Sequence, residues 1–136
     1  MASYKKFEDL PIWQKARSFS KKIFEISLEE KFSKEYRLCS QIRSASGSIM
    51  DNIAEGFERN GNGEFKQFLY IAKGSCGETR SQIYRAFDYG LISKDQFEEI
   101  KTQSEEISKS INKFIEYLNN TEIKGTKFKQ PLTPES

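Results

Sequence analysis

Six residues between positions 66 and 84 combine positive charge with aromatic rings at helical spacing. They are separated by steps of four, three, four, three and four residues, so in a helix they lie along one stripe. Cations neutralise phosphate groups and aromatic rings stack on bases, so this combination is typical of nucleic-acid binding. The glycine in the middle would let a backbone or a base approach. The stripe consists of Lys66, Tyr70, Lys73, Gly77, Arg80 and Tyr84.

A second interpretation of the stripe is an interface between subunits, in which the tyrosines pack against another copy and the cations stay solvated. Arg43 and Arg59 lie outside the stripe and are further candidate phosphate contacts. Another cationic group near the N-terminus is typical either of a solvated helix face or of a phosphate-contacting surface. It consists of Lys15, Arg17, Lys21 and Lys22.

The carboxylates of Glu55 and Glu78 are the candidates for acid–base chemistry. The chain contains no histidine, which removes the commonest general base and metal ligand. Two cysteines are too few for a structural zinc site. We therefore expect both glutamates to make structural contacts, with Arg43, Arg59 or Lys73 as partners. We expect no catalysis, no metal and no cofactor.

The composition is that of one domain with an ordinary core. Of 136 residues, 36% are hydrophobic and 13% aromatic, which suffices for a core without disulfides. The net charge of +2 is no evidence for nucleic-acid binding by itself. Cys39 and Cys76 are typical of small core residues in a reducing compartment. Because no secretory leader and no membrane-length apolar run occurs, we expect a cytoplasmic protein that does not contact membranes.

Helical periodicity over most of the chain predicts an all-α fold. No proline occurs between Pro11 and Pro131. Apolar residues recur at helical spacing in four segments, with breaks expected near 31–34, 57–63 and 90–93. Short connections make neighbouring helices antiparallel, so we predict an up-down-up-down four-helix bundle over residues 9–120. Residues 1–8 are predicted to form an N-terminal arm and residues 121–136 a flexible tail.

Each predicted helix has a capping signal and an apolar face. Gly90 favours the left-handed end of the third helix, and Ser93 with Gln96 forms a capping-box pattern for the fourth. The expected N-caps of the first three helices are Asp9, Ser33, and Asn60 or Asn62. The predicted apolar faces include Phe24, Tyr36 and Phe87, and in the fourth helix the a/d seam Phe97, Ile100, Ser104, Ile107, Ile111, Phe114 and Leu118.

Two features of the third helix predict self-association. Gly74 and Gly77 lie in its interior, where glycine costs roughly 1 kcal/mol relative to alanine. We therefore expect both at a close helix–helix or subunit contact. Tyr70, Ile71 and Tyr84 lie off the main apolar line, whereas a monomeric bundle needs only one apolar face per helix. This surplus predicts a closed homo-oligomer.

Four motifs between residues 9 and 78 carry a family resemblance that covers roughly residues 7–118. They are Asp9-Leu10-x-x-Trp13-Gln14-x-Ala16, Leu38-x-x-Gln41-Ile42-Arg43, Asn52-Ile53-Ala54-Glu55-Gly56-Phe57-x-Arg59 and Phe68-Leu69-x-Ile71-Ala72-Lys73-Gly74-Ser75-x-x-Glu78. The chain resembles the bacterial four-helix-bundle family named for proteins encoded within intervening sequences of the large-subunit ribosomal RNA gene. The motif residues of most interest are Asn52, Glu55, Gly56 and Glu78.

The resemblance implies a four-helix bundle that assembles into a ring-shaped homopentamer. It also implies kinship with the accessory protein of diversity-generating retroelements, a basic pentamer that binds nucleic acid and a reverse transcriptase. RNA or DNA, and a nucleic-acid enzyme such as a reverse transcriptase, are therefore expected partners.

Two hypotheses for function follow. The first is a non-enzymatic oligomeric bundle that binds RNA or DNA phosphates with low sequence selectivity. It requires the acidic C-terminal helix to face away from the ligand. The second is a structural or protein-interaction module that does not bind nucleic acid. In the first hypothesis, Tyr70 and Tyr84 stack on bases, and the phosphate contacts are Arg43, Arg59, Lys66, Lys73 and Arg80.

Overall fold

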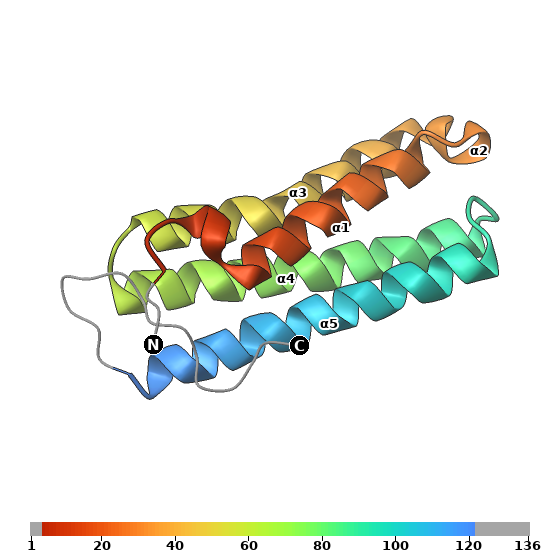
Figure 1. Ribbon diagram of the computed structural model, residues 1–136. Coiled ribbons are helices and arrows are strands. Elements are labelled where there is room, and N and C mark those ends of the chain that lie inside the picture. Colours follow the sequence, from red (N-terminus) through yellow and green to blue (C-terminus); the bar gives the residue numbers. More distant parts are fainter. Residues whose placement is uncertain (1–3, 122–136) are drawn as a thin grey trace.

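The computed structural model describes residues 4–121, and this part of the chain is all-helical (Figure 1). Its elements, in order, are η1 (Phe7–Asp9), α1 (Pro11–Ser27), α2 (Glu30–Ser33), α3 (Tyr36–Glu58), α4 (Asn62–Asp88) and α5 (Lys94–Asn119). No strand occurs within residues 4–121, which confirms the all-α prediction for this range. Apart from its first residue, the predicted tail at 121–136 lies outside the described residues.

The four long helices pack along their lengths around one core. The most extensive contact joins α3 and α4; α4 also packs against α5, and α1 packs against α3 and, less extensively, α5. Figure 1 shows α1 beside α3, and α4 beside α5. All seven residues of the predicted a/d seam of α5 are buried, as expected. The bulkiest fully buried side chains are Phe19, Phe32, Phe57, Phe65 and Phe114.

The described part of the predicted N-terminal arm lies against the helices. Tyr4 is buried, with its ring 6.5 Å from that of Phe114 in α5. Phe7 packs edge-on against Trp13 of α1 at 5.2 Å. These aromatic contacts join residues 4–8 to the core of the helical body.

The first break differs from the prediction because Phe32 buries its ring in the core. The turn that carries it forms the short helix α2, which overlaps the predicted break at 31–34. Ser33 is not an N-cap; its hydroxyl donates to the Glu30 carbonyl oxygen at 3.0 Å. Asp9 is not an N-cap either, because it belongs to η1 and Leu10 takes the cap position. Pro11 begins α1, as predicted for its first turn.

The second break is shorter than predicted, because α3 continues through Gly56 to Glu58. Neither asparagine caps α4; its N-cap is Gly61, and Asn60 lies in the turn with a φ of 64°. Asn62 instead reaches the other end of the chain. Its Nδ2 donates to the carbonyl oxygens of Leu118 at 3.0 Å and Thr121 at 2.7 Å. These bonds tie the start of α4 to the C-terminal end of α5 and the residue that follows the turn after it.

The signals at the third break are confirmed. Gly90 adopts a φ of 74°, the left-handed conformation that glycine tolerates without strain. The amide of Gln96 donates to Ser93 Oγ at 3.1 Å, and the amide of Ser93 donates to Gln96 Oε1 at 2.9 Å. This is the predicted capping box at the start of α5.

Three residues that we expected in the core are exposed: Phe24 by 47%, Phe87 by 37% and Tyr36 by 80%. The guanidinium of Arg43 covers the Phe24 ring at 4.8 Å, and Phe87 stacks on Phe97 at 4.7 Å. The prediction was wrong here because helical spacing gives the centre of an apolar face but not its width.

Candidate nucleic-acid interface

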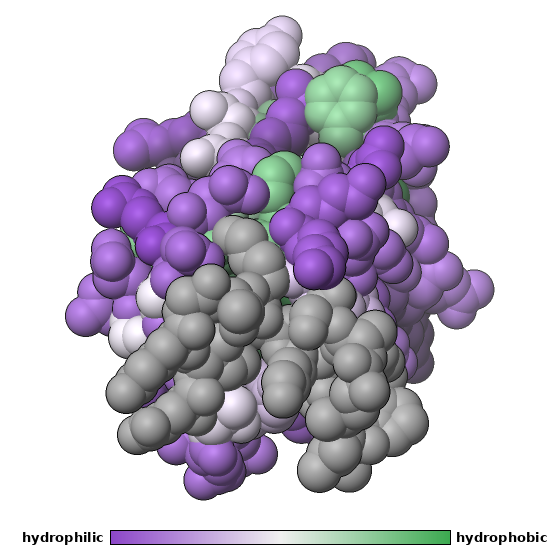
Figure 2. Space-filling view, turned by 60° about the vertical axis from the view of Figure 1, so that its left-hand side comes forward, coloured by the Kyte–Doolittle hydropathy of each residue, from purple (hydrophilic) through white to green (hydrophobic). Residues whose placement is uncertain are grey.

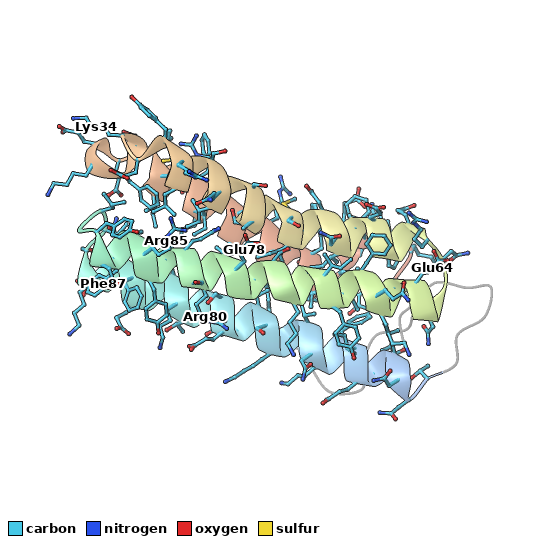
Figure 3. The ribbon with its side chains drawn as sticks, turned by 180° about the vertical axis from the view of Figure 1, so that it is seen from behind. Lys34, Glu64, Glu78, Arg80, Arg85 and Phe87 are labelled. Atoms are coloured by element: carbon cyan, nitrogen blue, oxygen red, sulfur yellow. The ribbon has the colours of Figure 1, made fainter. Side chains whose placement is uncertain are left out.

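The cationic stripe of α4 lies along the seam between α4 and α5. Lys66 Nζ donates to Asn119 Oδ1 at 3.0 Å, and Lys73 Nζ donates to Asn112 Oδ1 at 3.1 Å. Figure 3 shows Arg80 on the side of α4 that faces α5. Three predicted site cations of α4 are therefore brought together along one seam, with α5 as their neighbour.

A groove of about 280 Å³ opens in this seam, and we call it the α4–α5 groove. Among the groups that line it, only Glu105 carries negative charge, and the Lys101 ammonium lies 3.6 Å from its carboxylate. Within residues 4–121, the side chains of Arg80 and Lys109 make no hydrogen bond or ion pair. Among the described residues, neither the Arg80 guanidinium nor the Lys109 ammonium of the groove is therefore paired with a carboxylate. Its lining residues are Lys73, Arg80, Glu105, Ser108, Lys109 and Asn112.

The expectation that the acidic helix faces away from the stripe is wrong. α5 forms one wall of the groove and supplies four of its lining residues. The hypothesis still stands, because Glu105 is the one carboxylate that α5 contributes to the groove lining, whereas Glu99, for example, pairs with Lys22 of α1. Sequence reasoning missed Ser108, Lys109 and Asn112, whose spacing of one, three and four places them on one helix face.

The two aromatic members of the stripe differ in the contacts that hold their rings in place. The Tyr84 ring is 44% exposed and packs edge-on against Phe97 of α5, with centroids 4.9 Å apart. Tyr70 is 55% exposed. Gly77 lies between Lys73 and Arg80 on the stripe, and a Cβ at this position would meet nothing within 4 Å outside its own helix. The stripe is therefore open at its centre.

Arg43 makes structural contacts between α1 and α3. Its Nε donates to Ser27 Oγ at 2.7 Å, and its guanidinium lies over the Phe24 ring. Ser27 is fully buried, so the arginine is anchored by a group that solvent does not reach. Arg43 does not line the α4–α5 groove.

Arg59 joins the ends of α3 and α4. Its guanidinium lies 3.2 Å from the Glu55 carboxylate and 3.6 Å from that of Glu64, and it covers the Phe68 ring at 5.3 Å. The expected pairing of Glu55 with an arginine is thus present. Exposed pairs of this kind contribute about 0–1 kcal/mol each. Neither Arg59 nor Glu55 lines the groove.

Glu78 lies on the opposite flank of α4, where Figure 3 shows it and Arg85 toward α3. Its carboxylate accepts from Gln82 Nε2 at 3.4 Å, so its partner is not one of the expected cations. Arg85 Nη1 donates to Gln41 Oε1 of α3 at 3.4 Å. The two glutamates proposed as a carboxylate pair therefore occupy separate structural contacts.

The close helix contact expected at Gly74 is not found within the subunit, nor is the one expected at Gly77. A Cβ at either position would meet no atom within 4 Å outside its own helix. Gly56 of α3 is the glycine with a close neighbour, because a Cβ there would lie 2.6 Å from Phe68 Cβ and 3.0 Å from Phe65 Cδ1. The subunit contact predicted for Gly74 and Gly77 stays a prediction.

Both cysteines are buried thiols that donate to backbone carbonyls. Cys76 Sγ donates to the Ser104 oxygen at 3.1 Å, and Cys39 Sγ to the Phe32 oxygen at 3.1 Å. Burial raises the pKa of Cys76 to about 11, against a smaller opposing effect of the Arg80 charge. Burial also raises the pKa of Cys39. High thiol pKa values make reactive cysteine chemistry unfavourable.

Comparison with known proteins gives the family. The family described as 23S rRNA-intervening sequence protein matches residues 8–113. The chain belongs to this family. A solved structure of a protein with unknown function from the S23 ribosomal protein family of Bacteroides thetaiotaomicron VPI-5482 is similar to it. The two share 26% identity with a TM-score of 0.71, over 76% of this chain and 97% of the other. No curated protein matches.

Residues of the family motifs join α3 to α4. Asn52 Nδ2 donates to the carbonyl and the hydroxyl oxygen of Ser48, both at 2.8 Å. Ser75 Oγ of α4 donates to the same hydroxyl at 3.0 Å. Together with the close approach of Gly56 to Phe68, these bonds give the motif a packing role.

The surface of this family member is predominantly polar at the end shown in Figure 2, where hydrophobic side chains occur in a few separate places. Within the described range 4–121, no helix is long and apolar enough to cross a membrane. The same residues contain no group of three or more acidic or cysteine side chains that could hold a metal ion.

Proposed function

We propose that this protein is a non-enzymatic, oligomeric helical bundle that binds RNA or DNA through phosphate contacts with low sequence selectivity. The α4–α5 groove carries the proposal, because Arg80 and Lys109 converge there without a protein partner among residues 4–121. Nucleic acids present phosphates at regular intervals, and cations that neutralise them release counterions, which favours binding. The chain offers no base-reading motif, so we expect little discrimination among sequences.

The proposed architecture is an antiparallel up-down-up-down four-helix bundle. The support is that consecutive long helices α3, α4 and α5 pack side by side across connections of only a few residues. It is consistent with a groove that Lys73 and Arg80 of α4 line together with Lys109 of α5.

We further propose that the bundle assembles as a homopentamer, as the family resemblance implies. Tyr70 is 55% exposed and Ile71 52% exposed, next to the open position at Gly74. Large apolar side chains beside a missing one let another helix approach closely. A ring would repeat the α4–α5 groove in every subunit, so weak individual contacts with one strand would add up.

The proposed setting is the cytoplasm, with a nucleic-acid enzyme such as a reverse transcriptase as a partner. The enzyme partner is proposed from the resemblance to retroelement accessory proteins alone. Buried, unpaired thiols at Cys39 and Cys76 are compatible with a reducing compartment.

The alternative is a structural or protein-interaction module. It is favoured by exposed apolar side chains at Leu28, Tyr36 and Tyr89, which lie outside the cationic stripe. Such residues are typical of surfaces that contact proteins, whereas phosphate binding does not need them.

A fluorescence-anisotropy titration distinguishes the two functions. Labelled single- and double-stranded oligonucleotides are titrated with the protein at low and at physiological salt. We expect binding at low salt that weakens with added salt, and weaker binding by a triple variant with Lys66, Lys73 and Arg80 each changed to glutamine. The matched control removes three exposed cations elsewhere, with glutamine at Lys31, Arg37 and Lys94. Absence of binding at low salt would favour the protein-interaction module.

A further inference from the structure

We propose that the α4–α5 groove accepts single-stranded nucleic acid, with a phosphate on Arg80 and Lys109 and the adjoining base on Tyr84. The inference rests on the proposed function and adds to it the strand class and the unit that is recognised. Three observations support it. Arg80 and Lys109 lie on the two walls of the groove, and the Tyr84 ring, one helical turn from Arg80, packs against Phe97. Gly77 leaves the α4 backbone uncovered between Lys73 and Arg80.

The phosphate part follows from the donors that surround the groove. Arg80 comes from α4 and Lys109 from α5, so an anion between them is contacted from both walls. The hydrogen bond from Lys73 occupies Asn112 Oδ1, which leaves the amide Nδ2 of Asn112 as a donor. Ser108 adds a hydroxyl. Donors on both walls of the groove can bind different oxygens of one phosphate, and the charged donors make the stronger hydrogen bonds.

The groove is larger than one inorganic ion requires. Its volume is about 280 Å³. In the proposed complex it holds a phosphate and part of the attached sugar, and the strand continues along the seam between α4 and α5.

The base part follows from the position and support of Tyr84. Residues four apart in a helix are separated by about 6 Å along its axis, so Tyr84 lies one turn beyond Arg80. Phe97 packs edge-on against the Tyr84 ring at 4.9 Å and is itself stacked on Phe87 at 4.7 Å. A half-exposed ring held in this way is a stacking platform that loses little freedom on binding.

The combination favours a single strand over a duplex. In a duplex the bases are stacked and paired, so a ring on a helix surface reaches phosphates but not base faces. In a single strand the base beside a bound phosphate can turn onto Tyr84. The missing side chain at Gly77 lets the strand pass close to the α4 backbone between Lys73 and Arg80.

Four variants test the assignment by fluorescence anisotropy with short oligo(dT) and with a hairpin duplex. Arg80→Gln with Lys109→Gln should weaken binding of both probes by about tenfold or more. Tyr84→Leu keeps an apolar group against Phe97 and should weaken oligo(dT) binding about tenfold, while hairpin binding changes little. Tyr84→Phe keeps the ring and should bind like the wild type. The charge-matched control, Lys31→Gln with Arg37→Gln, should change neither affinity appreciably.

The outcomes separate the inference from the proposed function. If the wild type binds oligo(dT) but the groove and control pairs weaken it equally, the phosphate site is wrong and general nucleic-acid binding stands. If Tyr84→Leu weakens both probes equally or neither, the single-strand assignment is wrong. If the wild type binds neither probe at low salt, both the inference and the proposed function fall. Thermal melts confirm that each variant is folded, and Tyr84→Phe decides the role of the ring if the leucine variant unfolds.

Discussion

The backbone of Gly56 in α3 lies against Phe68 in α4, so that a Cβ at position 56 would be 2.6 Å from the Cβ of Phe68. Real Cβ atoms do not approach so closely, and the Phe68 Cβ cannot move without its backbone. This contact fixes the separation of α3 and α4 near their connection, and α4 carries the cationic wall of the groove.

We predict that Gly56→Ala lowers the free energy of unfolding by about 1–3 kcal/mol, because the two helices must separate. Urea denaturation followed by circular dichroism measures the effect. Gly47→Ala, in the same helix α3, is the matched control, since its methyl group would enter open space. There we expect no loss and a gain of up to about 1 kcal/mol from better helix propensity. Equal effects of the two substitutions would refute the assigned contact.

Asn62→Ala should lower the free energy of unfolding by about 1–2 kcal/mol. The substitution removes two hydrogen bonds, to the carbonyls of Leu118 and Thr121, each contributing about 0.5–1.5 kcal/mol. The control is Asn60→Gly, which suits a φ of 64° and should change stability by less than about 0.5 kcal/mol. Hydrogen exchange should also accelerate at the C-terminal end of α5 in the Asn62 variant alone.

The Cys76 thiol should make the fold less stable at high pH. Its pKa rises from 9.0 to about 11 on folding, because burial disfavours the thiolate. Below pH 9 the thiol is protonated in both the folded and the unfolded state, so its contribution to stability does not change with pH. Between pH 9 and about 11 only the unfolded state ionises, so stability falls by about 1.4 kcal/mol per pH unit. Other groups also titrate there, so the measurement is the difference between the wild type and Cys76→Ala. The variant should lose less stability over this range; parallel curves would contradict the assignment.

Ile71→Glu should reduce the oligomer to smaller species without unfolding the subunit. The side chain is 52% exposed within the subunit, so the charge is tolerated in the monomer but is costly in an apolar subunit contact. Sedimentation velocity should give about five times the 15.8 kDa chain mass for the wild type and for Tyr36→Glu, a control at a more exposed position on α3. A wild type that sediments as a monomer at micromolar concentration would exclude the proposed ring.

Local signals in the sequence predicted the features that depend on near neighbours. The a/d seam of α5, the capping box at Ser93 and the left-handed Gly90 each involve residues within one or a few turns. Asn62 failed as a predicted cap because its partners, Leu118 and Thr121, are far away in the sequence. Such a contact depends on which helix ends meet, and periodicity contains no information about that.

The same distinction applies to the candidate site. Helical spacing placed Lys73 and Arg80 on one stripe, and the structure confirms that they share a groove. Helical spacing could not reveal that Lys109 lies across the groove from Arg80, because this position depends on the rotation of α5 about its own axis. The tight contact within the subunit was missed for a related reason: Gly74 and Gly77 stand out in a helix pattern, whereas the contact at Gly56 is created by Phe68 of another helix. The subunit contact at Gly74 and Gly77 stays a prediction.

The salt dependence of single-strand binding tests most directly the claim that Arg80 and Lys109 bind phosphate in the α4–α5 groove. The association constant for oligo(dT) is measured by anisotropy over a range of salt concentrations and plotted on logarithmic axes. Each neutralised phosphate contributes about 0.7 to the slope for a single strand, so Arg80→Gln with Lys109→Gln should reduce it by about 0.7–1.4. Lys31→Gln with Arg37→Gln should leave it unchanged. An unaltered slope in the groove variant, or an equal reduction in both, would contradict the account.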